Sequence, residues 1–417
     1  STPLYSSAAS DVYKRQIDMS KQIQEAYIVA ATRLPVGKRN GAYATTRPDD
    51  LLAAALQGVL AQTPWLDAAR IDDVITGCAM PEAEQGMNVA RIGLLLAGLP
   101  QSVAGVTVNR FCASGLQAVA DAAARIRTGE ADIMIGSGTE SMSAMPQIMG
   151  NKVSLNPAIF SHPENIGMAF GMGLTGEKVA EQWKVSREDQ DAFALASQQK
   201  ASAAIAAGHF RAETTPFEVV TRLPGGSDGN VRETRRLVEV DEGPRPDSTA
   251  EALARLKPVF AARGSVTAGN SSQMSDGAAA VVLVSERVLR EFNLNPLARF
   301  VGFAVAGVPP EVMGIGPMAA IPKVLTRAGI RQEDLDWIEL NEAFAAQSLA
   351  VIRELKLDPS KVNPLGGAIA LGHPLGATGA IRTATLTHGL RRTGGKYGLV
   401  TMCIGTGMGA AGLFEAL

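Results

Sequence analysis

The sequence predicts an α/β protein made of two similar halves built from βαβ units, with a largely helical lobe inserted into the chain. Short apolar segments alternate with amphipathic segments of helical period, which indicates parallel strands covered by helices on both faces. The order of strand, polar turn and helix at residues 71–93 returns at 335–355. Between residues 146 and 264, strand-like runs become scarce while turns and prolines multiply. This segment is therefore predicted to be the inserted lobe.

The composition is compatible with a large buried core and excludes some classes of function. The chain has 417 residues, of which 46% are hydrophobic, and 39 Lys and Arg nearly balance 41 Asp and Glu. We therefore expect two or three domains and no nucleic-acid partner. The longest apolar runs are too short to cross a bilayer, so no membrane span is expected. Three cysteines without a CxxC spacing indicate neither a disulfide framework nor a zinc site, and a cytoplasmic location fits best.

Residues 1–18 do not match the pattern of the rest of the chain. They are polar and unpatterned, and they end just before Met19. They contain no apolar core of the kind that a signal peptide needs. We interpret them as a non-native or disordered extension and exclude them from the fold.

The N-terminal elements begin with a strand at residues 26–33, followed by a helix at 47–63. A strand at 71–80 contains Cys78, which we interpret as a core cysteine, and a helix at about 86–97 follows it. Alternation of this kind is typical of βαβ units.

The next unit places a cysteine where a strand passes into a helix. Val106 and Val108 predict a short buried strand, a tight turn carries Cys112, and an Ala-rich helix ends at Gly129. The N–H groups and partial positive charge of a helix N-terminus favour a thiolate, so a lowered pKa is expected for Cys112. Taken alone, the stretch is equally compatible with a buried structural cysteine.

Within the lobe, the clearest element is a helix that begins after Ser186, with acidic residues in its first turn. The segment GMGLTG at residues 171–176 matches the dinucleotide pattern GxGxxG, but it follows no strand and is interpreted as a chance match. Insertions of this length commonly shape a binding site. After the lobe, a turn rich in Ser, Gly and Asn at 264–275 could offer hydroxyl and N–H groups to a ligand.

The final third of the chain repeats the first. The segment around His373 parallels the Cys112 helix, and the segment around Cys403 parallels residues 131–140. A site between the halves would collect Cys112 from one half, and Asn341, His373 and Cys403 from the other. A cysteine with a distant histidine is the arrangement expected when a base activates a thiol.

Each of the three later residues also has a structural interpretation when taken singly. His373 could be a turn residue, Asn341 a helix N-cap and Cys403 a core residue. The other histidines, His162, His209 and His388, are too scattered for a metal site, and we expect no metal.

Five motifs in order carry a resemblance to a known family. They are VNRFCASG around Cys112, GNSSQMSDGAA from Gly269, NEAFAAQ from Asn341, GGAIALGHPLGATGA around His373 and CIGTGMG at Cys403. From about Ala26 to the C-terminus, the chain resembles the thiolase family. The resemblance implies a layered α-β-α-β-α core. Its N-terminal half would comprise residues 19–145 with 265–294, its C-terminal half 295–417, and the lobe at 146–264 would shape a CoA site.

The resemblance also implies a reaction and roles. The enzyme would cleave 3-ketoacyl-CoA with CoA, reversibly and by a ping-pong mechanism, in fatty-acid β-oxidation. Cys112 would be the acylated nucleophile and His373 its base, while Cys403 would protonate the departing acetyl-CoA enolate. One oxyanion would be held by His373 with a water on Asn341, and another by the N–H groups of Cys112 and Gly405.

Ser272 would contact the pantetheine arm of CoA, because it matches the family motif. CoA and acyl-CoA would be substrates, with no permanently bound cofactor. The family is oligomeric, which implies a homodimer or homotetramer, and the resemblance leaves open an association with a β-oxidation dehydrogenase or hydratase.

Two departures from the family pattern bear on the substrate. Many short-chain biosynthetic relatives carry His-Met-Gly where this chain has Gly171, Met172 and Gly173, which favours a degradative enzyme with a broader chain-length range. Thr406 stands where relatives often have glycine, at a position that tolerates several residues.

Three alternatives remain open. An acetyl-CoA acetyltransferase that makes acetoacetyl-CoA shares the same chemistry. A decarboxylating ketoacyl synthase would use a Cys-His-His set, but Cys403 stands in the place of the second histidine. A non-catalytic acyl-CoA or lipid carrier should have lost Cys112, His373 or Cys403, and this chain keeps all three.

Overall fold

The computed structural model describes residues 23–145, 155–225 and 230–417. The predicted extension at 1–18 and the start of the predicted lobe, residues 146–154, lie outside the described residues. Within the described ranges, no helix is long and apolar enough to cross a membrane.

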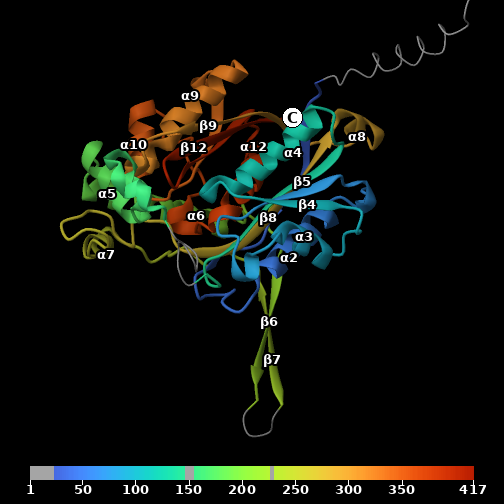
Figure 1. Cartoon of the computed structure of the whole chain (residues 1–417), viewed down its shortest axis with the longest axis horizontal. Coiled ribbons are helices and arrows are strands. Elements are labelled where there is room, and N and C mark those ends of the chain that lie inside the picture. Colours follow the sequence, from blue (N-terminus) through green and yellow to red (C-terminus); the bar gives the residue numbers. More distant parts are fainter. Residues whose placement is uncertain (1–22, 146–154, 226–229) are drawn as a thin grey trace, which may run out of the picture.

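Ten strands of the described chain form one mixed sheet (Figure 1). In spatial order its main path is β10 (Leu335–Leu340), β11 (Tyr397–Ile404), β12 (Met408–Ala416), β9 (Ala298–Gly307), β1 (Ala26–Arg33), β8 (Ser275–Ser285), β5 (Ile133–Ser141), β3 (Asp73–Gly77) and β4 (Ala104–Val108). The short strand β2 (Gly37–Lys38) pairs with β8 off this path.

The sheet consists of two halves with the same pairing, which confirms the predicted repeat. In the first half β3 runs parallel to β5, which pairs antiparallel with β8, and β8 pairs antiparallel with β1. In the second half β10, β11, β12 and β9 repeat that series. The halves join where Tyr27 and Ile28 of β1 pair with Arg299 and Ala298 of β9.

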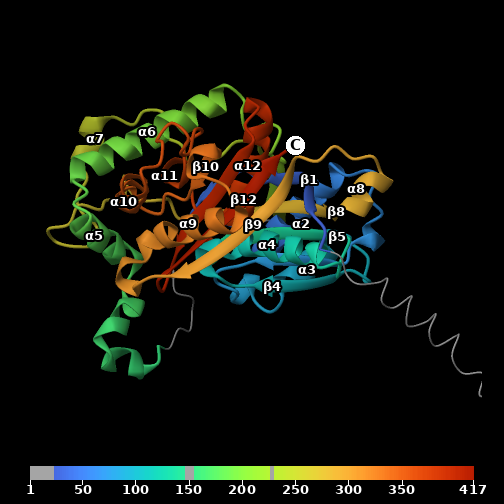
Figure 2. The ribbon, with the colours of Figure 1, turned by 90° about the horizontal axis from the view of Figure 1, so that it is seen from above.

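The helices of the described chain are α2 (Pro48–Ala61), α3 (Val89–Leu96), α4 (Ser114–Arg127), α5 (Met172–Gln182), α6 (Arg187–Ala206), α7 (Ala250–Ala254), α8 (Glu286–Glu291), α9 (Gly316–Ala328), α10 (Ala345–Leu355), α11 (Ala368–Leu371) and α12 (Thr378–Thr393). Of these, α4, α12, α2, α3, α9 and α10 form the remaining layers of the predicted α-β-α-β-α core. Helices α4 and α12 pack against each other between the two half-sheets, whereas α2 and α3 cover one outer face and α9 and α10 the other (Figure 2).

Glycines let the two central helices touch at their N-termini. A Cβ atom on Gly115 of α4 would lie 2.8 Å from the backbone nitrogen of Ala380, and one on Gly379 of α12 would collide with Leu116. A side chain at either position would separate the helices. The absence of Cβ atoms there therefore brings the segment before each helix close to the other.

Two local expectations from the N-terminal half need correction. The strand with Val106 and Val108 is β4, which is half-exposed rather than buried, because it is the edge strand of the sheet. Cys78 follows the end of β3 instead of lying within the strand, although it is fully buried, as predicted.

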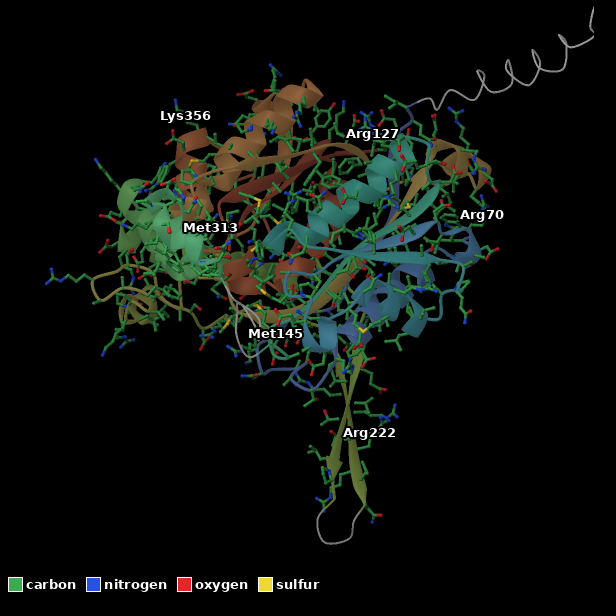
Figure 3. The ribbon with its side chains drawn as sticks, viewed as in Figure 1. Arg70, Arg127, Met145, Arg222, Met313 and Lys356 are labelled. Atoms are coloured by element: carbon green, nitrogen blue, oxygen red, sulfur yellow. The ribbon has the colours of Figure 1, made fainter. Side chains whose placement is uncertain are left out.

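The inserted lobe contains α5, α6 and α7, but it is less helical than predicted. Strands β6 (Phe217–Pro224) and β7 (Val231–Val238) form a hairpin that projects from the body (Figure 1). Its side chains are mostly exposed and form ion pairs between its strands, such as Arg222 with Glu233 and Arg235 with Glu218 (Figure 3). Because neither face is buried, the hairpin has no alternation of apolar and polar residues to reveal it in the sequence.

Candidate functional site

The predicted site residues lie at the ends of strands and at helix starts on both halves. Cys112 is in the 3-10 turn η3 (Phe111–Ala113) between β4 and α4. His373 lies after α11 and before the 3-10 turn η8 (Leu375–Ala377), which leads into α12. Asn341 follows β10, and Cys403 is near the end of β11. Turn η3 contacts both η8 and β11, so the structure brings these segments together.

The two cysteines face the same small space. The backbone N–H of Gly405 donates a hydrogen bond to the sulfur of Cys112, which lowers the pKa of that thiol relative to burial alone. The negative charge that Cys112 would carry raises the pKa of Cys403, which requires the two sulfurs to be near each other. Cys112 is partly accessible, whereas Cys403 is buried.

The hydrogen bonds of His373 define its tautomer. The Thr378 hydroxyl donates to the carbonyl oxygen of Pro374 at 3.1 Å, and its oxygen lies 2.7 Å from Nδ1 of His373. With the hydroxyl proton on that carbonyl, the arrangement fits a hydrogen on Nδ1 of the ring. In this tautomer Nε2 is unprotonated and accepts from Nδ2 of Asn341 at 3.3 Å.

The electrostatics of the site correct one expectation. Burial raises the pKa of Cys112 to about 12 and outweighs the hydrogen bond from Gly405, so the predicted lowering at the helix N-terminus is wrong. Burial, with a contribution from the charge of Arg382, lowers the pKa of His373 to about 3. At neutral pH the resting pair is therefore a thiol and a neutral imidazole.

Asn341 is held by its backbone and points a free oxygen into the site. Its N–H donates to the carbonyl of Thr401 in β11 at 2.9 Å, and its own carbonyl accepts from the side chain of Gln347. The residue that caps α10 is Phe344, so Asn341 is not the N-cap. In the part of the chain that the structure describes, the buried Oδ1 of Asn341 has no hydrogen-bond partner.

Strained backbone flanks the two N–H groups beside the sulfur of Cys112. Phe111 has φ 45° and Thr406 has φ 67°, and neither is a glycine. The left-handed region is unfavourable for such residues, especially for a β-branched threonine, and costs about 1–3 kcal/mol in typical cases. Strain of this kind is concentrated at functional sites, and here it lies directly before Cys112 and directly after Gly405.

An apolar wall closes the site on the lobe side. Cys403 packs with Val266, Met313 and Phe344, and Met172 lies against this cluster (Figure 3). A Cβ on Gly405 would lie 3.6 Å from the sulfur of Met172.

The glycines of GMGLTG are explained by this wall. A Cβ on Gly173 would collide with the ring of Phe260, and one on Gly176 would lie 3.0 Å from that of Phe344. Gly171 has open space around it and an ordinary backbone conformation, so a side chain could be accommodated there.

A groove of about 260 Å³ lies between the lobe and the core. Arg245, Ser248 and Leu253 line it on the lobe side, and Gly269 and Gln273 line it on the side of the core. Gln273 accepts the backbone N–H of His373 through its carbonyl at 3.2 Å, so one segment borders both the groove and the site.

The predicted contact Ser272 is half-buried between Gly269 and Gln273, and its N–H donates to Ala343 at 2.9 Å. Arg245 and its neighbours were not predicted from the sequence. They lie in loops without periodic pattern, and only the length of the insertion pointed to them.

Comparison with known proteins agrees with this geometry. Residues 26–287 match the family model of the thiolase N-terminal domain, and residues 294–416 match that of the thiolase C-terminal domain. The 3-ketoacyl-CoA thiolase of Bacillus subtilis is 51% identical over 395 residues, which cover 94% of this chain and 100% of that protein. The β-ketoadipyl-CoA thiolase of Pseudomonas aeruginosa is 46% identical over 407 residues, covering 93% and 98%. The crystal structure of human mitochondrial 3-ketoacyl-CoA thiolase matches with a TM-score of 0.84 and 39% identity, covering 95% of this chain and 100% of that one.

Proposed function

The chain belongs to the thiolase family, and we propose that it cleaves 3-ketoacyl-CoA with CoA through an acyl thioester on Cys112. It is an acyltransferase with the activity of a 3-ketoacyl-CoA thiolase of the β-oxidation type. The observation that carries the proposed roles is the meeting of Cys112 from one half with Cys403, Gly405 and His373 from the other.

In the first step, the thiol of Cys112 gives its proton to Nε2 of His373 as the sulfur attacks the 3-keto carbon. The neutral resting pair means that this proton moves during attack. The protonated Nε2 and a water on Asn341 then face the developing oxyanion, and the unpartnered Oδ1 of Asn341 supports a role in holding that water. The hydrogen bond from Nδ1 to Thr378 keeps the ring in place.

In the second step the bond between C2 and C3 breaks, which leaves the acyl group on Cys112 and the electron pair on C2 of acetyl-CoA. The thiol of Cys403 protonates C2 to release acetyl-CoA. CoA then gives its proton to the Cys403 thiolate and attacks the acyl thioester, whose oxygen faces the N–H groups of Cys112 and Gly405. As acyl-CoA leaves, Nε2 of His373 returns its proton to the Cys112 thiolate. Both cysteines are then thiols again and His373 is a neutral imidazole.

The groove along the lobe is the proposed binding place of CoA. Arg245 lines the groove and supplies a positive charge for a phosphate. Ser272 does not line the groove, but it stands between the lining residues Gly269 and Gln273 and is proposed to offer its hydroxyl to the pantetheine arm. CoA thioesters are the substrates of the family, and the proposed reaction uses no resident cofactor. A cytoplasmic location and an association with a β-oxidation dehydrogenase or hydratase stay predictions.

The substrate range separates degradation from synthesis. We expect the enzyme to turn over 3-ketoacyl-CoA of medium and long chain length, because no side chain at position 171 fills the space beside Met172. The relatives named for β-ketoadipyl-CoA add a carboxylated acyl chain as a second candidate. The test is kcat/KM for thiolysis along a ladder of 3-ketoacyl-CoA lengths that includes β-ketoadipyl-CoA.

The matched variant Gly171→His should lower kcat/KM for long chains by about tenfold and spare acetoacetyl-CoA, since a lost methylene-sized space is worth 10- to 200-fold in discrimination. Turnover of acetoacetyl-CoA alone by the unmodified enzyme would reject the degradative assignment in favour of the acetyltransferase.

We also propose that the enzyme is a homo-oligomer that associates through β4. This strand has no second strand partner among the described residues, and exposed Met87, Leu95 and Leu96 belong to the segment that packs beside it. Light scattering should give at least twice the 43.5 kDa of one chain. Val106→Pro should reduce the mass to that of a monomer, because proline breaks strand pairing. A monomeric unmodified protein would contradict this proposal.

A further inference from the structure

Glu140 is a buried carboxylate that the reaction described above does not use. It lies in β5 with 1% of its surface exposed. Its Oε2 accepts the backbone N–H groups of Ala79 at 2.7 Å and Gly376 at 2.8 Å. Its Oε1 accepts the N–H of Met80 at 3.2 Å and the side-chain amide of Gln85. Four N–H donors on two oxygens fit an ionised carboxylate, since a carboxylic O–H would oppose one of them.

The hydrogen bond from Gly376 connects Glu140 to the loop of His373. Gly376 is in η8, three residues after the histidine. A Cβ on Gly376 would lie 2.6 Å from the backbone nitrogen of Ala79 and 2.7 Å from Oε2 of Glu140. Only glycine lets the histidine loop approach the carboxylate this closely. The contact therefore crosses from the N-terminal half to the C-terminal half.

The hydrogen bond from Ala79 connects Glu140 to the turn of Cys112. The carbonyl of Ala79 accepts from Nδ2 of Asn109 at 3.0 Å, and Oδ1 of Asn109 accepts the N–H of Phe111 at 2.8 Å. Phe111 has the strained φ of 45° and precedes Cys112 directly. The N–H of Ala79 thus donates to Glu140, while its carbonyl accepts from Asn109, which supports the strained turn.

We propose that Glu140 is a positioning residue for thiolysis, in which one carboxylate ties the loop of His373 to the turn of Cys112 across the two halves. This inference rests on the proposed function, because it concerns the same pair of residues. Besides holding the loops, the negative charge of Glu140 acts on the sulfur and raises the pKa of Cys112. The other titratable group that interacts with this sulfur is Cys403, and the Cys78 thiol faces Glu140 itself.

Two variants separate geometry from charge. Glu140→Asp keeps the charge but is one methylene shorter, so it cannot reach both Ala79 and Gly376. We expect kcat to fall about 100-fold, which is typical of a misplacement of about 1 Å, with KM for CoA changed less than about threefold. Glu140→Gln keeps the length but loses the charge and turns an amide N–H toward an N–H donor. We expect a similar fall in kcat, together with alkylation of Cys112 by iodoacetamide that begins at lower pH.

The matched control is Glu213→Gln. Glu213 is also fully buried, pairs with Arg33 at 2.7 Å and accepts the hydroxyl of Thr385 in α12 at 2.7 Å, and neither partner belongs to the Cys112 turn or the His373 loop. This variant should lose thermal stability while kcat and the pH profile of Cys112 alkylation stay unchanged. Equal falls in kcat for Glu213→Gln and Glu140→Gln, or kcat within threefold of the unmodified enzyme for both Glu140 variants, would overturn the proposal.

If Glu140→Gln does not fold, Gln85→Ala takes its place, because it removes one donor and leaves the carboxylate. An intermediate fall in kcat, about tenfold, supports the proposal, and unchanged kcat refutes it. The alkylation profile needs no substrate. A failure of the proposed function, seen as no thiolysis by the unmodified enzyme, is thus distinguishable from a failure of the role of Glu140.

Discussion

Cys112→Ala is expected to abolish thiolysis, with kcat reduced by roughly 10⁴-fold or more, as for removal of the nucleophile in other covalent enzymes. The sulfur is the atom that becomes acylated, and no other nucleophile replaces it under the N–H of Gly405. Intact-mass spectrometry after mixing with a 3-ketoacyl-CoA should show an acyl adduct on the unmodified enzyme and none on the variant. CoA binding should persist, because the groove along the lobe is unchanged.

The control for this experiment is Val288→Ala. Val288 of α8 is small, fully buried, and packed in the core, away from the catalytic pair and from Glu140. The variant should keep its acyl adduct and its activity while losing about 1 kcal/mol of stability. Peptide mapping that finds the acyl group on any residue other than Cys112 would contradict the assigned nucleophile.

Cys403→Ser is expected to separate proton transfer from acylation. Exchange of the methyl protons of acetyl-CoA with deuterated water reports enolate formation, and its rate should fall about 10³-fold, within the range for loss of a general acid or base. A serine hydroxyl has a much higher pKa than a thiol and exchanges protons with carbon poorly. Transfer of a labelled acyl group from acyl-CoA to Cys112 should remain detectable.

Val288→Thr is the matched control, because it places a hydroxyl in the buried core outside the site, and it should leave the exchange rate unaltered. If Cys403→Ser eliminates acylation of Cys112 as well as proton exchange, the proposed division of labour between the two cysteines is wrong.

Much of the fold followed from the sequence because the two halves bury their elements in a regular way. The strand predicted at residues 26–33 coincides with β1, and the repeat of strand, turn and helix corresponds to β3 with α3 and to β10 with α10. These elements have apolar faces that packing requires. The hairpin of β6 and β7 has none, and the exposure of β4 depends on its place at the sheet edge, which no local pattern reveals.

The sequence indicated candidate site residues, but it did not indicate their electrostatics. Ordered motifs indicated Cys112, Asn341, His373 and Cys403, and the structure brings their segments together. The raised pKa of Cys112 could not be predicted, because the burial that raises it comes from the other half of the chain. For the same reason, the contacts of Glu140 could not be predicted. They join residues 79 and 376 to a strand that is far from both along the sequence.

The most direct test of the account is a crystal structure of the enzyme acylated by a 3-ketoacyl-CoA in the absence of free CoA. We predict continuous density from the sulfur of Cys112 to the acyl carbon, with the thioester oxygen within hydrogen-bond distance of the N–H groups of Cys112 and Gly405. Nε2 of His373 and the sulfur of Cys403 should both face that thioester. An acyl group on another residue, or a His373 and Cys403 that point away from an acylated Cys112, would contradict the account.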